Sequence, residues 1–162
     1  MRCTPPFPFT PSTMCLSCLL LLSVAAASSG SDYISRNSPK RVQVVVDDLA
    51  SRLSLPVTVS ATVVRTNPLL VSVEPQQGQD NTFVLSFEDG FLDELDDEDL
   101  RAVIAHELGH VWIFTHHPYL QTERLANSVA LRVVSRRSLE KVYDKVWGRS
   151  GTKGDIVRFL GR

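Results

Sequence analysis

The sequence predicts an α+β fold in which one helix and a short three-stranded sheet precede a series of further helices. Apolar residues recur at helical spacing over residues 38–53, and alternating apolar and polar residues then mark three short segments between residues 57 and 87. From residue 89 onward the apolar residues return to the helical repeat. The chain has 162 residues, of which 43% are hydrophobic, and this is enough for one modest domain.

Residues 1–27 differ from the rest of the chain and predict a secretory signal peptide. Arg2 is basic, residues 15–24 form a short uncharged apolar stretch, and small residues follow up to Ser29. Such a segment directs export, so we expect the protein to be secreted or periplasmic. After cleavage we expect no stable membrane span, and an uncleaved anchor is the alternative.

All three cysteines lie in this leading segment, so the mature chain would have no disulfide and no cysteine-bound metal. The polar residues 28–37 predict a flexible lead-in, residues 38–148 the folded domain, and residues 149–162 a C-terminal tail. The formal net charge of −1 gives no reason to expect nucleic acid as a partner. Nothing in the sequence indicates an oligomeric state.

The first half of the domain should contain one helix and then the sheet. Ser38 is a suitable N-cap, and Pro39 suits the first position of a helix. We expect this helix to cover three strands, over residues 57–63, 69–73 and 82–87. A short helix carrying Phe91, Leu92 and Leu95 should follow.

The second half should be helical. Acidic residues cluster at positions 93–99, but they lack the spacing and glycine of a calcium loop, so they predict the cap of a helix from near Asp97 to about His116. Further helices are predicted over residues 121–135 and 139–147, with residues 136–138 as a break. From residue 148 on, glycines and basic residues predict a frayed tail, whose apolar residues would still allow it to dock back.

The motif His106-Glu107-Leu108-Gly109-His110 is an instance of HExxH. Residues four apart on a helix share a face, so His106 and His110 would present two imidazoles to one metal ion. Glu107 would lie close enough to reach a water on that metal. Two neutral nitrogen ligands and a nearby carboxylate are what hydrolysis by one Zn²⁺ requires.

A catalytic zinc needs a third protein ligand as well as an open position for water. His116 has the spacing of the pattern HExxHxxGxxH, but Ile113 stands where that pattern has the glycine that allows a sharp turn. A continuing helix would carry His116 about 15 Å along its axis from His106. His117 has even less to recommend it.

Glu123 is the better candidate for the third ligand. A tight turn at Pro118 would fold the following helix back against the HExxH helix and bring Glu123 to the metal. Asn127 lies four residues further on and shares a face with Glu123. Its side-chain oxygen could hold the far nitrogen of a ligand histidine and so fix the orientation of the ring.

HELGH followed by a helix with Glu123 and Asn127 resembles the gluzincin metallopeptidases. Residues 82–134 resemble the HtpX/CAAX-endopeptidase group, the run from Glu123 to Asn127 resembles ImmA/IrrE-type domains, and the short length resembles the minigluzincins. The resemblance implies a small zincin-like fold and a zinc metalloendopeptidase that acts on peptide or protein substrates. It departs at Asn127, where many gluzincins have aspartate.

The resemblance also implies a role for each site residue. His106, His110 and Glu123 would bind the zinc, and Glu107 would be the catalytic base. The strand at residues 83–87 would be the sheet edge that pairs with an extended substrate. Candidate donors to the oxyanion of the reaction are His117, Tyr119, Arg124 and Tyr143.

Two other functions stay open on the sequence alone. The first is a binding or regulatory domain that keeps the gluzincin fold and binds zinc with little or no turnover. The second is a structural metal site, in which Glu107 merely orients His106.

Overall fold

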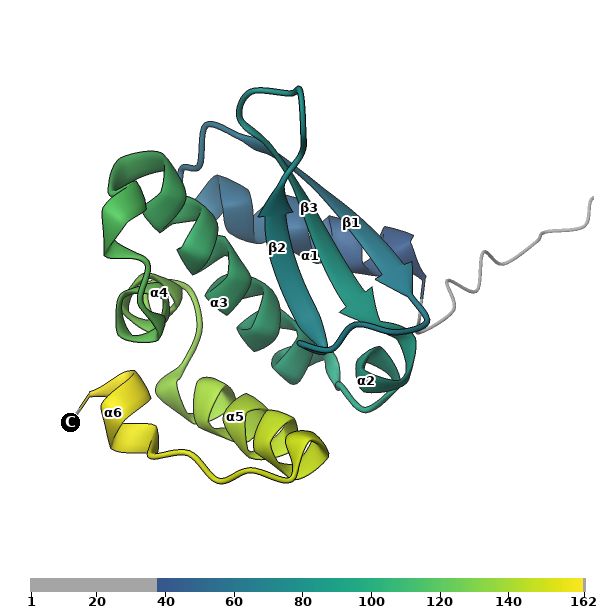
Figure 1. Cartoon of the computed structure of the whole chain (residues 1–162), viewed down its shortest axis with the longest axis vertical. Helices are drawn as coiled ribbons and strands as arrows, with labels where there is room; N and C mark the ends of the chain where they lie inside the picture. The colour runs from purple at the N-terminus through teal and green to yellow at the C-terminus, as the bar shows by residue number, and fades with distance from the viewer. Residues whose placement is uncertain (1–37, 162) are drawn as a thin grey trace, which may run out of the picture. The chain divides into compact units, whose positions relative to one another are not determined.

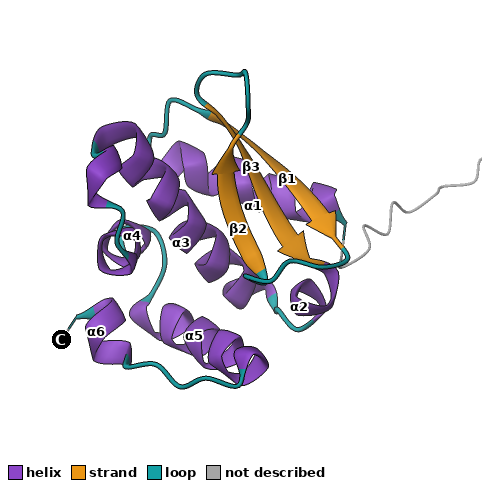
Figure 2. Ribbon diagram, in the orientation of Figure 1, coloured by secondary structure: helices purple, strands orange, loops and turns teal. Residues whose placement is uncertain are grey.

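The computed structural model describes residues 38–161, so the predicted signal peptide and lead-in (residues 1–37) lie outside the described residues. Figures 1 and 2 show the helices and strands of this part of the chain, and the predicted α+β class is confirmed. The elements are α1 Pro39–Arg52, β1 Thr58–Val64, β2 Val71–Pro75, β3 Thr82–Glu88, α2 Asp89–Asp93, α3 Asp97–His116, the 3-10 helix η1 Pro118–Leu120, α4 Glu123–Ala130, α5 Arg136–Ser150 and α6 Ile156–Leu160.

The sheet has the strand order β1-β3-β2, with β3 parallel to β1 and antiparallel to β2. Phe83, Leu85 and Phe87 alternate along β3 and are buried in the core with apolar residues of α1 and α3. The expectation that residues 83–87 form a sheet edge is therefore wrong, because β3 lies in the centre. Alternation predicts which side chains are buried, but strand order depends on pairing between distant segments.

The two edges of the sheet differ. The free edge of β1 is covered by the Gln43 side chain, whose Nε2 donates to the Val59 carbonyl at 2.8 Å and whose Oε1 accepts from the Ala61 N–H at 2.8 Å. This contact protects the edge from pairing with another strand. Figure 1 shows α3 running along the opposite edge of the sheet, beside β2.

The free edge of β2 faces α3. Leu70 accepts from Glu88 N–H and Gln76 donates to the Thr82 carbonyl, both at 2.8 Å. In an antiparallel pair the hydrogen-bonded positions alternate, so the N–H and C=O groups of Val71 and Val73 point away from β3.

The acidic cluster caps α3, as predicted. Asp96 is the N-cap and accepts from the Asp99 N–H at 2.8 Å, while the Asp99 carboxylate accepts from the Asp96 N–H at 3.4 Å. Asp99 is fully buried and also lies 2.9 Å from the ammonium groups of Lys141 and Lys145 on α5. The cluster therefore joins the start of α3 to α5, a role that the sequence did not reveal.

The C-terminal half differs from prediction at its boundaries. The helix expected over residues 121–135 ends at Ala130. Residues 136–138 do not break a helix but begin α5, because the Ser135 hydroxyl caps it by accepting from the Ser138 N–H at 3.1 Å. The predicted frayed tail instead contains α6, which docks back with Leu160 buried. Within residues 38–161 we find no helix with the length and apolar character that crossing a membrane requires.

Candidate metal centre

The two histidines of the HELGH motif lie together on α3. Their Nε2 atoms are 3.2 Å apart, and their rings meet edge to face with centroids 4.9 Å apart. The helical repeat alone produces this pairing, because residues four apart share a face. Both side chains open onto the cleft that separates α3 from β2 and α5.

Glu123, at the first position of α4, reaches the same point. Its Oε2 lies 3.2 Å from His106 Nε2 and its Oε1 lies 3.4 Å from His110 Nε2. The short helix η1 reverses the chain after α3, and Thr122 then caps α4 by accepting from the Leu125 N–H at 3.2 Å. The predicted turn at Pro118 therefore exists and brings Glu123 back to the histidines.

The spacing of these three donor groups fits zinc. Four ligands about 2.0 Å from a tetrahedral zinc are separated by about 3.3 Å, close to the observed 3.2 and 3.4 Å. Among the described residues, His106, His110 and Glu123 form the group of metal-binding side chains whose donor atoms lie within 4.8 Å of one another. Three protein ligands leave a fourth position for water, as in catalytic zinc sites.

The structure does not bring His116 to this group. Its ring stacks on Trp112 with centroids 4.3 Å apart, and its Nδ1 donates to the Trp112 carbonyl at 2.9 Å. His117 lies at the end of α3 and does not line the cleft.

Side-chain amides hold the far nitrogen of both histidines. Asn127 Oδ1 lies 2.8 Å from His106 Nδ1, and Gln121 Oε1 lies 3.2 Å from His110 Nδ1. A carbonyl oxygen can only accept, so each Nδ1 carries the proton and each Nε2 lone pair is free for a metal. Asn127 was predicted, but Gln121 was not, because it lies in the turn before α4 where no helical spacing relates it to His110.

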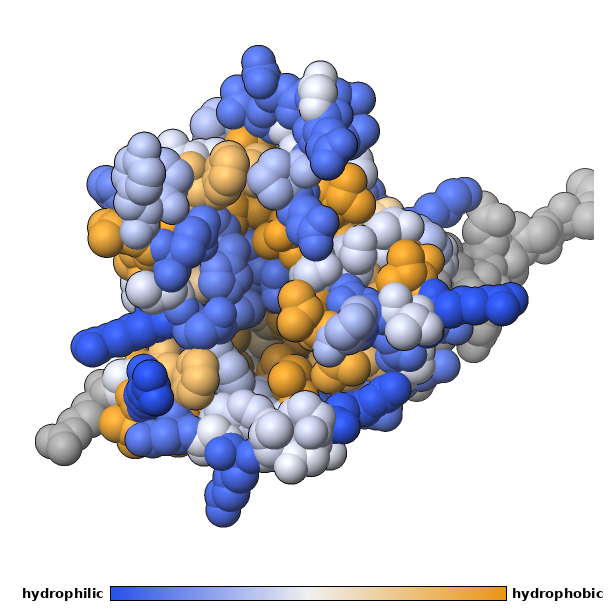
Figure 3. Space-filling view, in the orientation of Figure 1, coloured by the Kyte–Doolittle hydropathy of each residue, from blue (hydrophilic) through white to orange (hydrophobic). Residues whose placement is uncertain are grey.

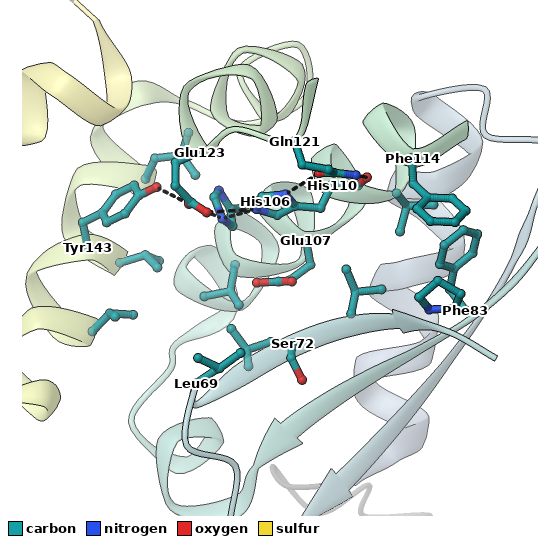
Figure 4. A pocket seen from close by; sticks show the side chains of 18 residues that line it. Leu69, Ser72, Phe83, His106, Glu107, His110, Phe114, Gln121, Glu123 and Tyr143 are labelled. Carbon is teal, nitrogen blue, oxygen red and sulfur yellow. Dashed lines mark hydrogen bonds and ion pairs between the residues drawn. The ribbon is translucent and has the colours of Figure 1, made fainter. Parts of the chain in front are cut away.

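Glu107 lies between the histidines and the free edge of β2 (Figure 4). Its side chain is buried, with 7% of the residue exposed. Burial raises the pKa of Glu107, while the neighbouring His106 and His110 and a hydrogen bond from the Val73 N–H act in the opposite direction. A buried carboxyl group with a raised pKa accepts a proton more readily than an exposed one.

The other titratable groups of the site follow their contacts. The contacts with the His106 and His110 rings lower the pKa of Glu123, so its carboxylate stays charged. Burial acts to lower the pKa of His110, but its contacts with Glu123 and Gln121 outweigh burial and raise it.

Tyr143 of α5 closes one side of the site. Its hydroxyl accepts from Asn127 Nδ2 at 2.7 Å and lies 3.5 Å from Glu123 Oε2. Burial raises its pKa, so the hydroxyl keeps its proton. Of the four candidate oxyanion donors, Tyr143 lines the cleft, whereas Tyr119 is 98% exposed.

The cleft around these residues has a volume of about 410 Å³ and walls that are mainly apolar. Figure 3 shows apolar residues gathered around a hollow on this face of the molecule. Phe83 and Phe114 form one end, with ring centroids 5.4 Å apart. The other apolar residues that line the cleft are Leu69, Val71, Val73, Pro75, Val103, Val111, Leu139, Val142 and Val146.

Comparison with known proteins agrees with this description. The crystal structure of the metallopeptidase zymogen of Pyrococcus abyssi abylysin is similar to 70% of this chain and 99% of its own, with a TM-score of 0.51 and 13% sequence identity. At this identity the similarity shows the fold, and it confirms the small zincin-like domain. A search of curated proteins found no match.

The sequence model of peptidase family M48 matches residues 37–152, which include every residue of the site. The resemblance to the HtpX/CAAX-endopeptidase and ImmA/IrrE groups stays a prediction. Since the match covers well over half of the chain, the protein belongs to peptidase family M48 and is a zinc metallopeptidase.

Proposed function

We propose that this chain hydrolyses peptide bonds with one zinc ion bound by His106, His110 and Glu123 and with Glu107 as the general base. The observation that carries the proposal is the position of Glu107. Its buried carboxyl group lies beside three donor atoms that have the spacing of zinc ligands, and it faces the cleft. A carboxylate that only oriented His106 would need to reach that ring, but Asn127 and Glu123 already contact its two nitrogens.

When bound, the zinc ion supplies a water of lowered pKa and polarises the carbonyl group to be cleaved. Glu107 would accept a proton from the attacking water as its oxygen bonds to the carbonyl carbon, and would then give the proton to the leaving amine nitrogen as the C–N bond breaks. The raised pKa of Glu107 supports the first step, because the group accepts a proton more readily than an exposed glutamate does.

Tyr143 is the donor that we assign to the oxyanion of the tetrahedral intermediate. Its oxygen already accepts a hydrogen bond from Asn127, so its single proton points into the cleft toward Glu123. A substrate oxygen that approached this position would receive the proton in a hydrogen bond.

The free edge of β2 is the part of the sheet that we assign to substrate binding. The N–H and C=O groups of Val71 and the C=O group of Val73 point toward the cleft, where the Val73 N–H donates to Glu107, whereas Gln43 occupies the corresponding groups of β1. An extended peptide would pair with β2 through main-chain hydrogen bonds and lay its side chains against the apolar walls.

We also propose where in or outside the cell this protein acts. The basic, apolar and small-residue order of the first 27 residues supports export, so we propose that the peptidase acts outside the cytoplasm.

The test compares Glu107→Gln with Glu94→Gln, an exposed control, in cleavage of a mixed peptide library with and without a chelator. We expect Glu107→Gln to lower kcat/KM by about 10²- to 10⁴-fold while it retains zinc, and we expect Glu94→Gln to behave as wild type. Full activity in Glu107→Gln would refute the assignment of Glu107 as the general base. If the wild type binds zinc but cleaves no peptide, the result would instead favour a binding or regulatory domain.

A further inference from the structure

Both the oxygen and the nitrogen of the fully buried Asn127 amide have hydrogen-bond partners. Its Oδ1 lies 2.8 Å from His106 Nδ1, and its Nδ2 lies 2.7 Å from the Tyr143 hydroxyl oxygen and 3.1 Å from the Phe159 carbonyl oxygen. Asn127 therefore connects the metal-binding face of α3 with α5 and with α6.

The Phe159 carbonyl decides which way this amide faces. A backbone carbonyl can only accept, so it must meet the NH₂ end of Asn127, and Oδ1 must then face His106. In that orientation Oδ1 accepts from the His106 Nδ1–H, and the Nε2 lone pair points toward His110 and Glu123. An aspartate at this position would present an oxygen to His106 in either orientation, while its second oxygen, which only accepts, could not hydrogen-bond to the Phe159 carbonyl. The requirement is specific to asparagine.

The Phe159 carbonyl belongs to residues 152–161, which we call the C-terminal strap and which contacts with α5 hold in place. The Phe159 ring packs on Tyr143 and Trp147, with centroids 5.3 and 5.9 Å away. Arg136 donates to the carbonyl oxygens of Leu160 at 3.4 Å and Gly161 at 2.8 Å.

The strap also passes closely over Trp147. A Cβ added at Gly154 would lie 2.9 Å from Trp147 Cη2 and closer still to other atoms of the ring. No larger residue fits at Gly154 unless the strap or the indole moves.

We propose that the C-terminal strap is a positioning element of the metal site. By presenting the Phe159 carbonyl to Asn127, it sets the orientation of the amide and hence the protonated nitrogen of His106. No residue of the strap lines the cleft, so the strap acts through Asn127 and Tyr143. This inference rests on the proposed role of His106 as a zinc ligand.

The test measures zinc affinity by competition with a chelator, in the absence of substrate, and strap docking by hydrogen exchange of the α6 amides. Arg136→Ala and Gly154→Ala should each speed exchange in α6 and weaken zinc binding by about 10-fold, the smaller of the usual effects of residues that orient ligands. Arg137→Ala is the matched control, since Arg137 is the exposed neighbour of Arg136, and should change neither.

A double-mutant cycle separates positioning from general loosening. In an Asn127→Asp background either carboxylate oxygen can accept from His106, so Arg136→Ala should weaken zinc binding no further. Equal losses in both backgrounds would overturn the proposal. So would release of the strap with unchanged zinc affinity, or a strap that stays protected in both Arg136→Ala and Gly154→Ala.

The outcome is independent of the proposed hydrolysis. A wild type that binds zinc but cleaves no peptide would refute the proposed function and leave the coupling intact. If the wild type cleaves peptides but its zinc affinity does not change when Arg136→Ala or Gly154→Ala releases the strap, only the coupling would be refuted.

Discussion

Gly109 of α3 meets the backbone of Ala126 of α4 with no side chain between them. A Cβ at Gly109 would lie 2.9 Å from Ala126 Cα and closer still to the Ala126 carbonyl oxygen. Glu123 shares a helix face with Ala126, three residues further on, and with Asn127, four residues further on. The close approach at Gly109 therefore brings the proposed third ligand and the His106 partner within reach of the histidines.

Replacing Gly109 by alanine should force α4 away from α3. We expect the free energy of unfolding to fall by about 1–3 kcal/mol, as for overpacked cores, and zinc affinity to fall with it. Gly148→Ala is the control, because a Cβ at Gly148 in α5 meets nothing within 4 Å. It should leave zinc affinity unchanged and stabilise the helix by up to about 1 kcal/mol. Urea denaturation and chelator competition measure both quantities.

Removing the third ligand should release the metal. We expect Glu123→Ala to lose zinc on dialysis and His116→Ala to keep it, since His116 stacks on Trp112 and does not reach the metal group. Wild type should melt at a higher temperature with zinc than after chelation, because a ligand that binds only the folded state stabilises it by about 2.7 kcal/mol at 100 times its Kd. Zinc retained by Glu123→Ala would remove Glu123 from the ligand set.

The pairing of Asp96 with Lys141 should appear as a pH-dependent contribution to stability. The Lys141 ammonium, 2.6 Å away, lowers the pKa of Asp96 from 3.8 to about 2. A lowered carboxyl pKa stabilises the folded state above the unfolded value, and the contribution disappears as pH falls through the folded value. Asp96→Asn keeps the helix cap but loses the charge, so it should be less stable than wild type at pH 6. The difference in stability should shrink as the pH falls from 3.8 to about 2.

Denaturant midpoints of both proteins across this pH range provide the measurement. A difference between wild type and Asp96→Asn that stays constant down to pH 2 would show that the charge contributes nothing.

A charge in the apolar wall of the cleft should impair cleavage of substrates with apolar side chains. Val146 of α5 lines this wall, so Val146→Asp should lower kcat/KM for such peptides by about 10- to 200-fold, the range for lost contacts in an apolar pocket. Val44, which is 66% exposed on α1, supplies the control Val44→Asp. Equal kcat/KM in both variants would show that substrate side chains do not use this wall.

Much of the site could be predicted because its chemistry is local. The spacing of His106 and His110 is a property of any helix, and the turn at Pro118 followed from the missing N–H of proline. The acidic cap of α3 followed from the rule that carboxylates satisfy the free amides at a helix start. These features depend on residues a few positions apart.

The errors arose where distant segments meet. Strand order placed β3 in the centre and left β2 as the edge beside Glu107, although both strands have the alternation of a half-buried strand. Gln121 and the Phe159 carbonyl reach their partners from a turn and from the last helix. Their sequence spacing from His110 and Asn127 follows no repeat.

The sequence by itself determined the two-histidine helix, the nearby carboxylate and the preference for Glu123 over His116, because helical periodicity and the rigidity of proline act within one or two turns of chain. Only the tertiary structure decided which strand borders the cleft, that Gln121 orients His110 and how the last helix reaches Asn127. The contacts of Gln121 with His110 and of Phe159 with Asn127 join residues 11 and 32 positions apart. They are set by packing of whole elements, which no local pattern encodes.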